Sequence, residues 1–473
     1  MKINHSEHFK ETLKGQLDLL KKDLSQLVAI NTVQDLNTSR QGQPFGQGIK
    51  EAFDWLENKA KTDGFECTNY SGYAMSIEYG HGEEILGILC HVDTVDIFEP
   101  DLWESDPFNL VERDGFWYGR GINDNKGPLL ACYYLLKYLK ESSYTPNKKI
   151  KLIIGGAEET TWACMDHYFK HAPMPDIGFS PDGNFPVVNL EMGIGYYKYS
   201  TQKQHKINPT YKENLEIPDH QIEKIETGND RTWVCYELSV YVNTLDLGDL
   251  LGQLKYFDSV EDSNELTKLV YRGKPAPARH PEKGISAALL MYKDFKDISN
   301  LDWNFRELLT TLGSLYEHEN KILATIQTQF GFDALATSNL SAIELTGSGS
   351  EIYFDYRYAL DINAGVMHQT LNALGEKHGM SFEVQQHMNR HFVAQDSALI
   401  HAMRASYEEV EHKPLKTLTK GAASYARVMD NAVAFGPTFE GKITNSHKPN
   451  ENIHIEDLIK ALMIYLELIR KLT

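Results

Sequence analysis

The sequence predicts an α/β protein with two domains, in which an α+β domain is inserted into a domain built on a central, mostly parallel sheet. The chain has 473 residues, which is more than one hydrophobic core usually organises. Strand-like segments that end in polar residues alternate with helical patterns up to about residue 190, and this style returns near the C-terminus. We therefore place the first domain at residues 1–190 and 383–473, and the inserted domain at residues 191–382.

Composition excludes several classes of partner. Hydrophobic residues make up 41% of the chain and charged residues 24%, as in ordinary globular proteins. The net charge of −19 offers no basic surface for nucleic acid. No apolar run approaches the roughly 18 residues of a membrane span, and the N-terminus lacks the apolar core of a signal peptide. The five cysteines include no Cys-x-x-Cys pair. We expect a cytoplasmic protein with neither a nucleic-acid nor a membrane partner.

Hydrophobic periodicity predicts the first elements in order. Leucines at helical spacing indicate a helix from about Ser6 to Ala29, and a second helix follows Gly48 and ends near Gly64. Two strand-like segments precede the apolar run from Ile85 to Leu89, which has the length of a fully covered strand. His91 and Asp93 come directly after this run. Chemistry in open α/β sheets collects beyond the carboxyl ends of strands, so this pair is a candidate site.

Three later segments repeat this layout. Asp124 precedes a helix that starts near Pro128, Glu158 and Glu159 follow the strand 150–154, and Asp182 follows a strand from Ile177. Asp124 or its neighbour Asn125 could instead serve as the cap of the helix. The adjacent glutamates could form only the acidic first turn of a helix, although their side chains diverge enough for two different roles.

The inserted domain shows other patterns. Its predicted elements are a polar excursion over about 202–229, strands at 236–242, 352–358 and from 382, and helices at 285–295, 303–316 and 363–378. The pattern of the first domain returns with Gly421–Arg427 and Asn445–Glu451, and the last predicted element is a helix from Ile455 to Leu472.

The candidate residues form a set of nitrogen and oxygen ligands: His91, Asp93, Asp124, Glu158, Glu159, Asp182 and His447. Such a set, without cysteine, suits zinc, manganese or cobalt. A two-metal hydrolytic site needs a bridging acid, ligands for each ion and a base for water. The set contains a candidate for every role, but spacing alone does not assign them.

Four motifs in this order resemble the co-catalytic zinc aminoacylase/carnosinase metallopeptidases. They are His91-Val-Asp93, Tyr118-Gly-Arg-Gly-x-x-Asp124-x-Lys-Gly-Pro128, Glu158-Glu159-Thr160 and Ser180-Pro-Asp182. Within that family the chain is most similar to the PepV-type bacterial dipeptidases. The resemblance covers nearly the whole chain and implies two divalent ions, zinc foremost, with manganese or cobalt as alternatives.

The resemblance also implies roles for the candidate residues. His91 and Asp182 would bind one ion, Glu159 and His447 the second, and Asp124 would bridge them. Asp93 would orient His91, and Glu158 would be the general base. The inserted domain would be a lid in which Arg357 clamps the substrate carboxylate, although Arg357 could also be an ordinary surface arginine. The length of the lid implies a monomer.

Three departures from the family pattern stand out. Pro277 occupies the position of the oxyanion-stabilising lid histidine, so His280 is the alternative donor. The glycine run that offers N–H groups to the substrate is Gly421-Ala422-Ala423 here, and the added methyl groups narrow the approach to the backbone. Asn125 replaces a common aspartate that is not a ligand.

The sequence therefore predicts a metal-dependent dipeptidase, in which a water activated between two ions attacks the amide bond. Two alternatives stay open. An N-acyl-amino-acid deacylase would use the same site on different substrates. A catalytically silent, peptide-binding relative would explain the departures at Pro277 and Ala422-Ala423, but it would have no use for a general base.

Overall fold

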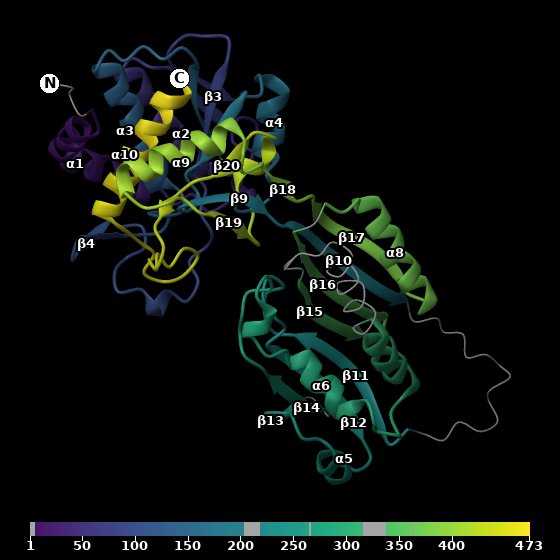
Figure 1. Cartoon of the computed structure of the whole chain (residues 1–473). Coiled ribbons are helices and arrows are strands. Elements are labelled where there is room, and N and C mark those ends of the chain that lie inside the picture. Colours follow the sequence, from purple (N-terminus) through teal and green to yellow (C-terminus); the bar gives the residue numbers. More distant parts are fainter. Residues whose placement is uncertain (1–4, 203–217, 264–265, 316–336, 360) are drawn as a thin grey trace. The chain divides into compact units, whose positions relative to one another are not determined.

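The computed structural model describes residues 5–202, 218–263, 266–315, 337–359 and 361–473 (Figure 1). Its contacts divide the chain into two compact units. The first unit runs to Glu191 and resumes at His391, and the second is Met192–Arg390. This is an α/β chain with one mixed, centrally parallel sheet and one separate antiparallel sheet, as the sequence predicts.

The first unit is built on one mixed sheet. Its strands are, in spatial order, β1 (Glu66–Tyr70), β2 (Ala74–Tyr79), β6 (Lys149–Gly155), β3 (Ile85–His91), β7 (Ile177–Ser180), β20 (Ala432–Ala434), β9 (Val187–Glu191) and β18 (His391–Phe392), with β19 (Thr417–Lys420) also paired to β9. At the centre β3 is parallel to both β6 and β7, and β7 is parallel to β20. Every residue of β3 is buried, which explains its uninterrupted apolar sequence.

Helices supply the rest of the first core. They are α1 (His5–Ala29), α2 (Gln47–Thr62), α3 (Lys126–Glu141), α4 (Ala163–His171), α9 (Ala398–Glu411) and α10 (Ile455–Leu472). The helix α3 packs on α1, α10 and β3, and α10 also packs on α9. The strands β4 (Val111–Arg113), β5 (Phe116–Tyr118) and β22 (Asn452–His454) form a small sheet, and β8 (Gly183–Asn184) pairs with β21 (Pro437–Thr438). The small sheet joins the chain beyond β3 to the segment that leads into α10.

The second unit contains an antiparallel sheet with its own core. Its strand order is β13 (Ser259–Ser263), β14 (Leu266–Arg272), β12 (Glu237–Thr244), β11 (His220–Thr227), β15 (Thr337–Thr346), β16 (Gly349–Tyr358), β10 (Gly193–Gln202) and β17 (Ser381–Met388). The helices α5 (Leu247–Gln253), α6 (Ala287–Phe295) and α8 (Ala364–Lys377) belong to this unit, as do the helical residues 303–315. Apolar side chains of these strands and helices form a second, separate core.

The second boundary between the units lies later than the sequence placed it. Residue 383, where we expected the first domain to resume, falls inside β17. That strand pairs with β10 along its length, so its residues belong to the antiparallel sheet. Part of the expected polar excursion, residues 203–217, lies outside the described residues. Within the described chain, no helix has both the length and the apolarity needed to cross a membrane.

Candidate metal centre

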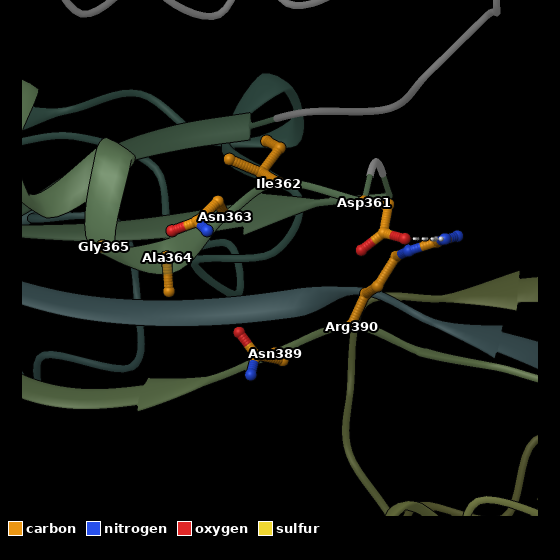
Figure 2. Close-up of a pocket in the computed structure, with 7 residues that line it drawn as sticks. All are labelled: Asp361, Ile362, Asn363, Ala364, Gly365, Asn389 and Arg390. Carbon is orange, nitrogen blue, oxygen red and sulfur yellow. Dashed lines mark ion pairs between the residues drawn. The ribbon is translucent and has the colours of Figure 1, made fainter.

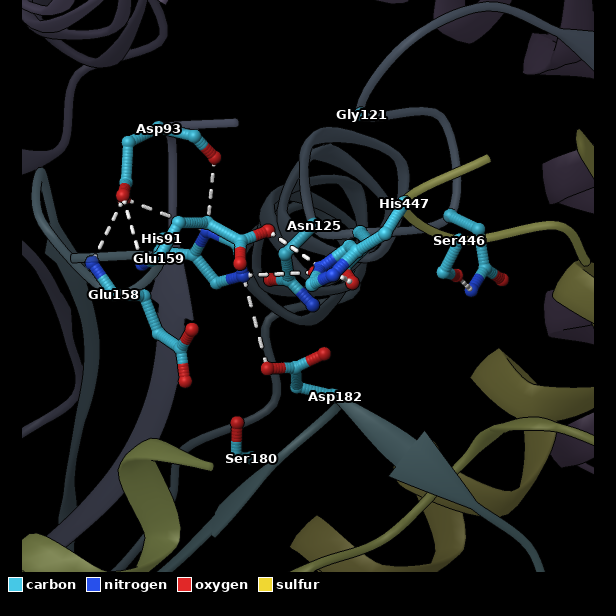
Figure 3. Close-up of polar contacts among 12 residues, drawn as sticks. His91, Asp93, Gly121, Asn125, Glu158, Glu159, Ser180, Asp182, Ser446 and His447 are labelled. Carbon is cyan, nitrogen blue, oxygen red and sulfur yellow. Dashed lines mark hydrogen bonds and ion pairs between the residues drawn. The ribbon is translucent and has the colours of Figure 1, made fainter. Parts of the chain in front are cut away.

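The parallel strands β3, β6 and β7 bring polar side chains to one edge of the first sheet. These strands end at His91, Gly155 and Ser180, and the predicted residues follow each end within a few positions. Figure 3 shows His91, Asp93, Glu158, Glu159, Asp182 and His447 gathered there. The strand-end layout therefore produces the expected cluster, and its geometry decides what each side chain can do.

His91 is completely buried and its orientation is fixed. Its Nδ1 lies 3.0 Å from the backbone carbonyl oxygen of Asp93, which can only accept a hydrogen bond, so Nδ1 carries the proton. Nε2 is therefore the ring nitrogen that faces the carboxylates, at 3.1 Å from Asp124 Oδ1 and 3.7 Å from Asp182 Oδ2. A neutral imidazole held in this tautomer is a ready metal ligand.

The carboxylate of Asp93 contacts the segment of the two glutamates as well as His91. It accepts hydrogen bonds from the backbone N–H groups of Glu158, at 3.1 Å, and Glu159, at 3.0 Å (Figure 3). The carboxylate oxygen nearest to His91 Nδ1 lies 3.5 Å away, farther than the backbone carbonyl. Asp93 thus orients His91 mainly through its backbone, and its side chain fixes the segment that carries both glutamates.

Asp124 lies between two imidazoles. Its Oδ1 is 3.1 Å from His91 Nε2, and its Oδ2 is 3.1 Å from His447 Nε2. The residue at the N-cap of α3 is Asn125, whose side chain donates to the carbonyl of Pro181 at 2.9 Å and makes no capping bond. Asp124 is therefore not a cap, and each of its oxygens faces a different histidine, as in a bridging carboxylate.

His447 completes the cluster from a loop far along the chain. Its Nε2 lies 3.0 Å from Glu159 Oε1 as well as 3.1 Å from Asp124. The backbone of His447 is in the left-handed region, with φ of 63°, which is uncommon for a residue with a side chain. Residues held in such conformations cluster at functional sites.

The carboxylates and imidazoles shift each other's protonation. Burial alone would lower the pKa of His91, but the hydrogen bonds to Asp124 and Asp182 raise it well above its ordinary value. Burial would raise the pKa of Asp124, yet the two histidines hold it well below its usual range. Burial raises the pKa of Glu158 well above its ordinary value, and burial together with the Asp124 charge raises that of Glu159 to about 7. These shifts show how strongly the site concentrates negative charge.

The donor set contains two groups of side chains that could each hold a metal ion. Ligand atoms of His91, Asp124 and Glu159 lie within 4.8 Å of one another, and so do those of His91, Glu158 and Asp182. Among the described residues, no lysine or arginine forms an ion pair with any of the five carboxylates, namely Asp93, Asp124, Glu158, Glu159 and Asp182. Buried carboxylates without cationic partners are costly unless they are protonated or bind metal.

Around the cluster lie buried residues to which the sequence assigned no role. Glu451 and Arg120 form a fully buried ion pair at 2.8 Å beneath the loop that ends at Asp124. Lys126 donates to the carbonyl of Ile30 at 2.8 Å, and burial lowers its pKa to about 7. The ring of Tyr425 meets that of His91 edge-on, with centroids 6.1 Å apart. Arg120 and Lys126 stand within the motif Tyr118–Pro128, and Glu451 ends the segment Asn445–Glu451 noted in the sequence. These positions were the available signal.

The remaining predicted residues lie elsewhere. His280 and Arg357 belong to the second unit, and Gly421 follows β19 in the first. His280 is half exposed, with Nδ1 3.3 Å from Glu282 Oε1. The Nε and Nη2 groups of Arg357 donate to the two oxygens of the buried Asp355, both at 2.7 Å. The Nε–Nη2 edge of the guanidinium, one of the two edges that can bind a carboxylate bidentately, is thus engaged within the protein. The roles of all three residues stay predictions.

A hollow in the second unit is lined by side chains of a different kind from those of the candidate metal centre. Figure 2 shows it at the start of α8, where it has a volume of about 380 Å3 and is lined by residues 361–365 together with Asn389 and Arg390. Asp361 pairs with Arg390 at 3.2 Å, and Asn363 caps α8 by accepting from Val366 N. These side chains hold the start of the helix and offer no metal-ligand set.

Comparison with known proteins agrees with the geometry. Residues 87–471 match the profile of Peptidase family M20/M25/M40. YtjP from Bacillus subtilis (strain 168) is 30% identical over 98% of both chains, and the Beta-Ala-Xaa dipeptidase of Lactobacillus delbrueckii subsp. lactis is 29% identical over 98% of both. The match to the family profile covers residues 87–191 and 391–471 of the first unit and the whole sequence of the second.

Solved structures show the same fold. The dipeptidase Dug1p from Saccharomyces cerevisiae aligns with a TM-score of 0.60 at 14% identity, and human carnosine dipeptidase 1 with 0.58 at 17%. Each alignment covers 98% of this chain and 98% of the other. With the family profile matched over most of the sequence and a candidate metal centre of histidines and carboxylates, this chain belongs to Peptidase family M20/M25/M40 and is a metallopeptidase with dipeptidase homologues.

Proposed function

We propose that this protein hydrolyses the peptide bond of dipeptides with the help of two divalent ions, zinc foremost, with manganese or cobalt as alternatives. The observation that carries the proposal is the position of Asp124 between His91 and His447, with 3.1 Å from each of its oxygens to one imidazole. A carboxylate whose two oxygens each face a different imidazole is placed to bridge two ions.

The residues divide into two ligand groups around Asp124. His91 and Asp182 would hold one ion, and Glu159 and His447 would hold the other. When bound, the ions would polarise the scissile carbonyl and lower the pKa of the attacking water towards about 7. Asp93 keeps the segment of Glu158 and Glu159 in place through its two backbone hydrogen bonds.

Glu158 would be the general base. Among the described residues, its carboxylate makes no hydrogen bond or ion pair, although its backbone is fixed by Asp93 and the side chain lies beside the cluster (Figure 3). A carboxylate free of partners can take a proton from water and deliver it to the leaving amine. His280, Arg357 and Gly421 would contribute to substrate binding, and these roles rest on the family resemblance.

A substrate panel tests the proposal. Metal-stripped protein would be assayed on free dipeptides, β-alanyl dipeptides and N-acetyl amino acids, before and after zinc, manganese or cobalt is added. We expect metal-dependent release of both amino acids from the free dipeptides. Cleavage of only the acetylated compounds would make the protein a deacylase. Binding of metal without cleavage of any compound would make it a silent relative.

A further inference from the structure

Glu451 is buried without exposed surface, and its carboxylate accepts four hydrogen bonds. Oε2 accepts from Arg120 Nη1 at 2.8 Å and from the backbone N–H of Gly121 at 3.0 Å. Oε1 accepts from the backbone N–H groups of Asn123 at 2.9 Å and Asp124 at 3.1 Å. A carboxylate has about four acceptor sites, so all of them are filled. Glu451 thus fixes the backbone of the loop that ends at Asp124.

The segment immediately before Glu451 carries His447 in an unfavourable backbone conformation. Asn445, His447 and Asn450 have φ of 53°, 63° and 59°, in the left-handed region that costs free energy for residues with a side chain. The segment is closed by a hydrogen bond from Asn452 N to the carbonyl of Thr444 at 2.8 Å. Such a loop keeps its shape only while neighbouring contacts hold it.

The two loops are tied to each other at three points around Glu451. Its carboxylate holds the Asp124 loop, and its backbone carbonyl accepts from Gly119 N at 3.1 Å. Asn123 Nδ2 donates to Ser446 Oγ at 2.9 Å. Glu451 therefore contacts both the backbone of Asp124 and the segment of His447. The side chains of Asp124 and His447 lie 3.1 Å apart.

We propose that Glu451 is a positioning residue that sets the separation of Asp124 and His447, and with it the affinity of the metal position that these two side chains share. It acts through backbone N–H groups and not by contact with metal or substrate. This inference rests on the two-ion site proposed above. Partners that orient metal ligands typically change metal affinity 10- to 100-fold when they are replaced, which gives the expected size of the effect.

The test is a metal titration of Glu451→Gln in the full chain. The amide keeps the length of the side chain but removes the charge and turns an N–H group towards donors. Metal-stripped wild type and variant would be titrated with zinc against a chelating indicator. We expect the affinity of the position that includes His447 to fall roughly 10- to 100-fold. The affinity of the other position, to which Asp124 also contributes, should fall less. Titration with cobalt should give an altered absorption spectrum for the weakened position.

A matched control separates positioning from a general loss of stability. Glu191 is also a buried carboxylate without exposed surface, and it accepts from Ser424 N at 3.1 Å and Arg427 Nε at 3.0 Å, neither of which belongs to a proposed metal ligand. Glu191→Gln should lower Tm about as much as Glu451→Gln but leave both zinc affinities unchanged. Equal weakening of zinc binding by both variants would overturn the inference.

Two further outcomes are distinguishable. If the wild type binds two ions and Glu451→Gln binds both as tightly, the inference fails and the proposed function stands. If the wild type binds no ions, both fail. Should Glu451→Gln not fold, Ser446→Ala removes the acceptor for Asn123 Nδ2 together with the contact to Thr444 Oγ1 at 3.3 Å. It should weaken the same metal position by a smaller factor, and unchanged affinities would then overturn the proposal.

Discussion

Replacing Asp93 by asparagine tests how the segment of the two glutamates is held. The carboxylate of Asp93 is almost wholly buried and accepts from Glu158 N and Glu159 N at 3.1 and 3.0 Å. An amide of the same shape keeps one acceptor oxygen and turns an N–H group towards the other donor. The loss of one charge-assisted hydrogen bond, with a buried N–H left unpaired, should lower the free energy of unfolding by about 2–4 kcal/mol. Displacement of the glutamates by as little as about 1 Å should lower kcat/KM around 10²-fold.

The assay compares Tm and kcat/KM at saturating metal for the wild type and Asp93→Asn. Asp294 in the second unit provides a control, because its buried carboxylate accepts from the backbone N–H groups of Lys255 and Tyr256, both at 2.9 Å. Asp294→Asn should lower stability but leave the apparent metal affinity unchanged. If Asp93→Asn lowers Tm without any effect on kcat/KM or metal affinity, Asp93 has only a structural role and the reasoning fails.

Three other predictions follow from the same contacts. Glu158→Gln should lower kcat by about 10²- to 10⁴-fold with both ions retained, and loss of an ion in metal analysis would instead make Glu158 a ligand alongside His91 and Asp182. Arg357→Lys should raise KM more for dipeptides with a free carboxylate than for amidated ones, and equal effects would leave only its pairing with Asp355. Burial would raise the pKa of Glu78, but Lys151 and Lys149 lower it. The charged form of Glu78 therefore stabilises the fold at pH values above the ordinary pKa of about 4.3, and this contribution is lost as pH falls through the lowered pKa. Glu78→Gln should therefore flatten the fall of Tm in acid, and an unchanged acid limb would contradict this.

Local patterns predicted the elements that position the site. The apolar run of β3 could be recognised because all its residues are buried, and the leucine stripe of α1 because one face packs on the core. The second boundary between the units was placed too early, inside β17. The pairing of β17 with β10 joins residues almost 200 positions apart, and no local pattern records which sheet a strand belongs to.

For the candidate site, the sequence predicted which side chains meet but not the contacts that hold them. Histidines and carboxylates at the ends of successive parallel strands could be expected to meet, and they do. The contacts that hold them could not be expected in the same way. Glu451 and Arg120 stand 331 positions apart, and their pairing appears only when the two loops are brought together. Likewise, sequence alone cannot show that the backbone carbonyl of Asp93 lies nearer to His91 Nδ1 than the carboxylate of Asp93 does.

The most direct test of a two-ion centre is to measure dipeptide hydrolysis as a function of the number of ions bound per chain. Metal-stripped protein would receive increasing equivalents of zinc while dipeptide hydrolysis and bound metal are measured on the same samples. The account predicts that activity reaches its maximum at two ions per chain, and that His447→Ala, which removes one of the two imidazoles facing Asp124, tightly binds only one. Full activity with one ion, or two tightly bound ions in His447→Ala, would contradict a two-ion centre bridged by Asp124.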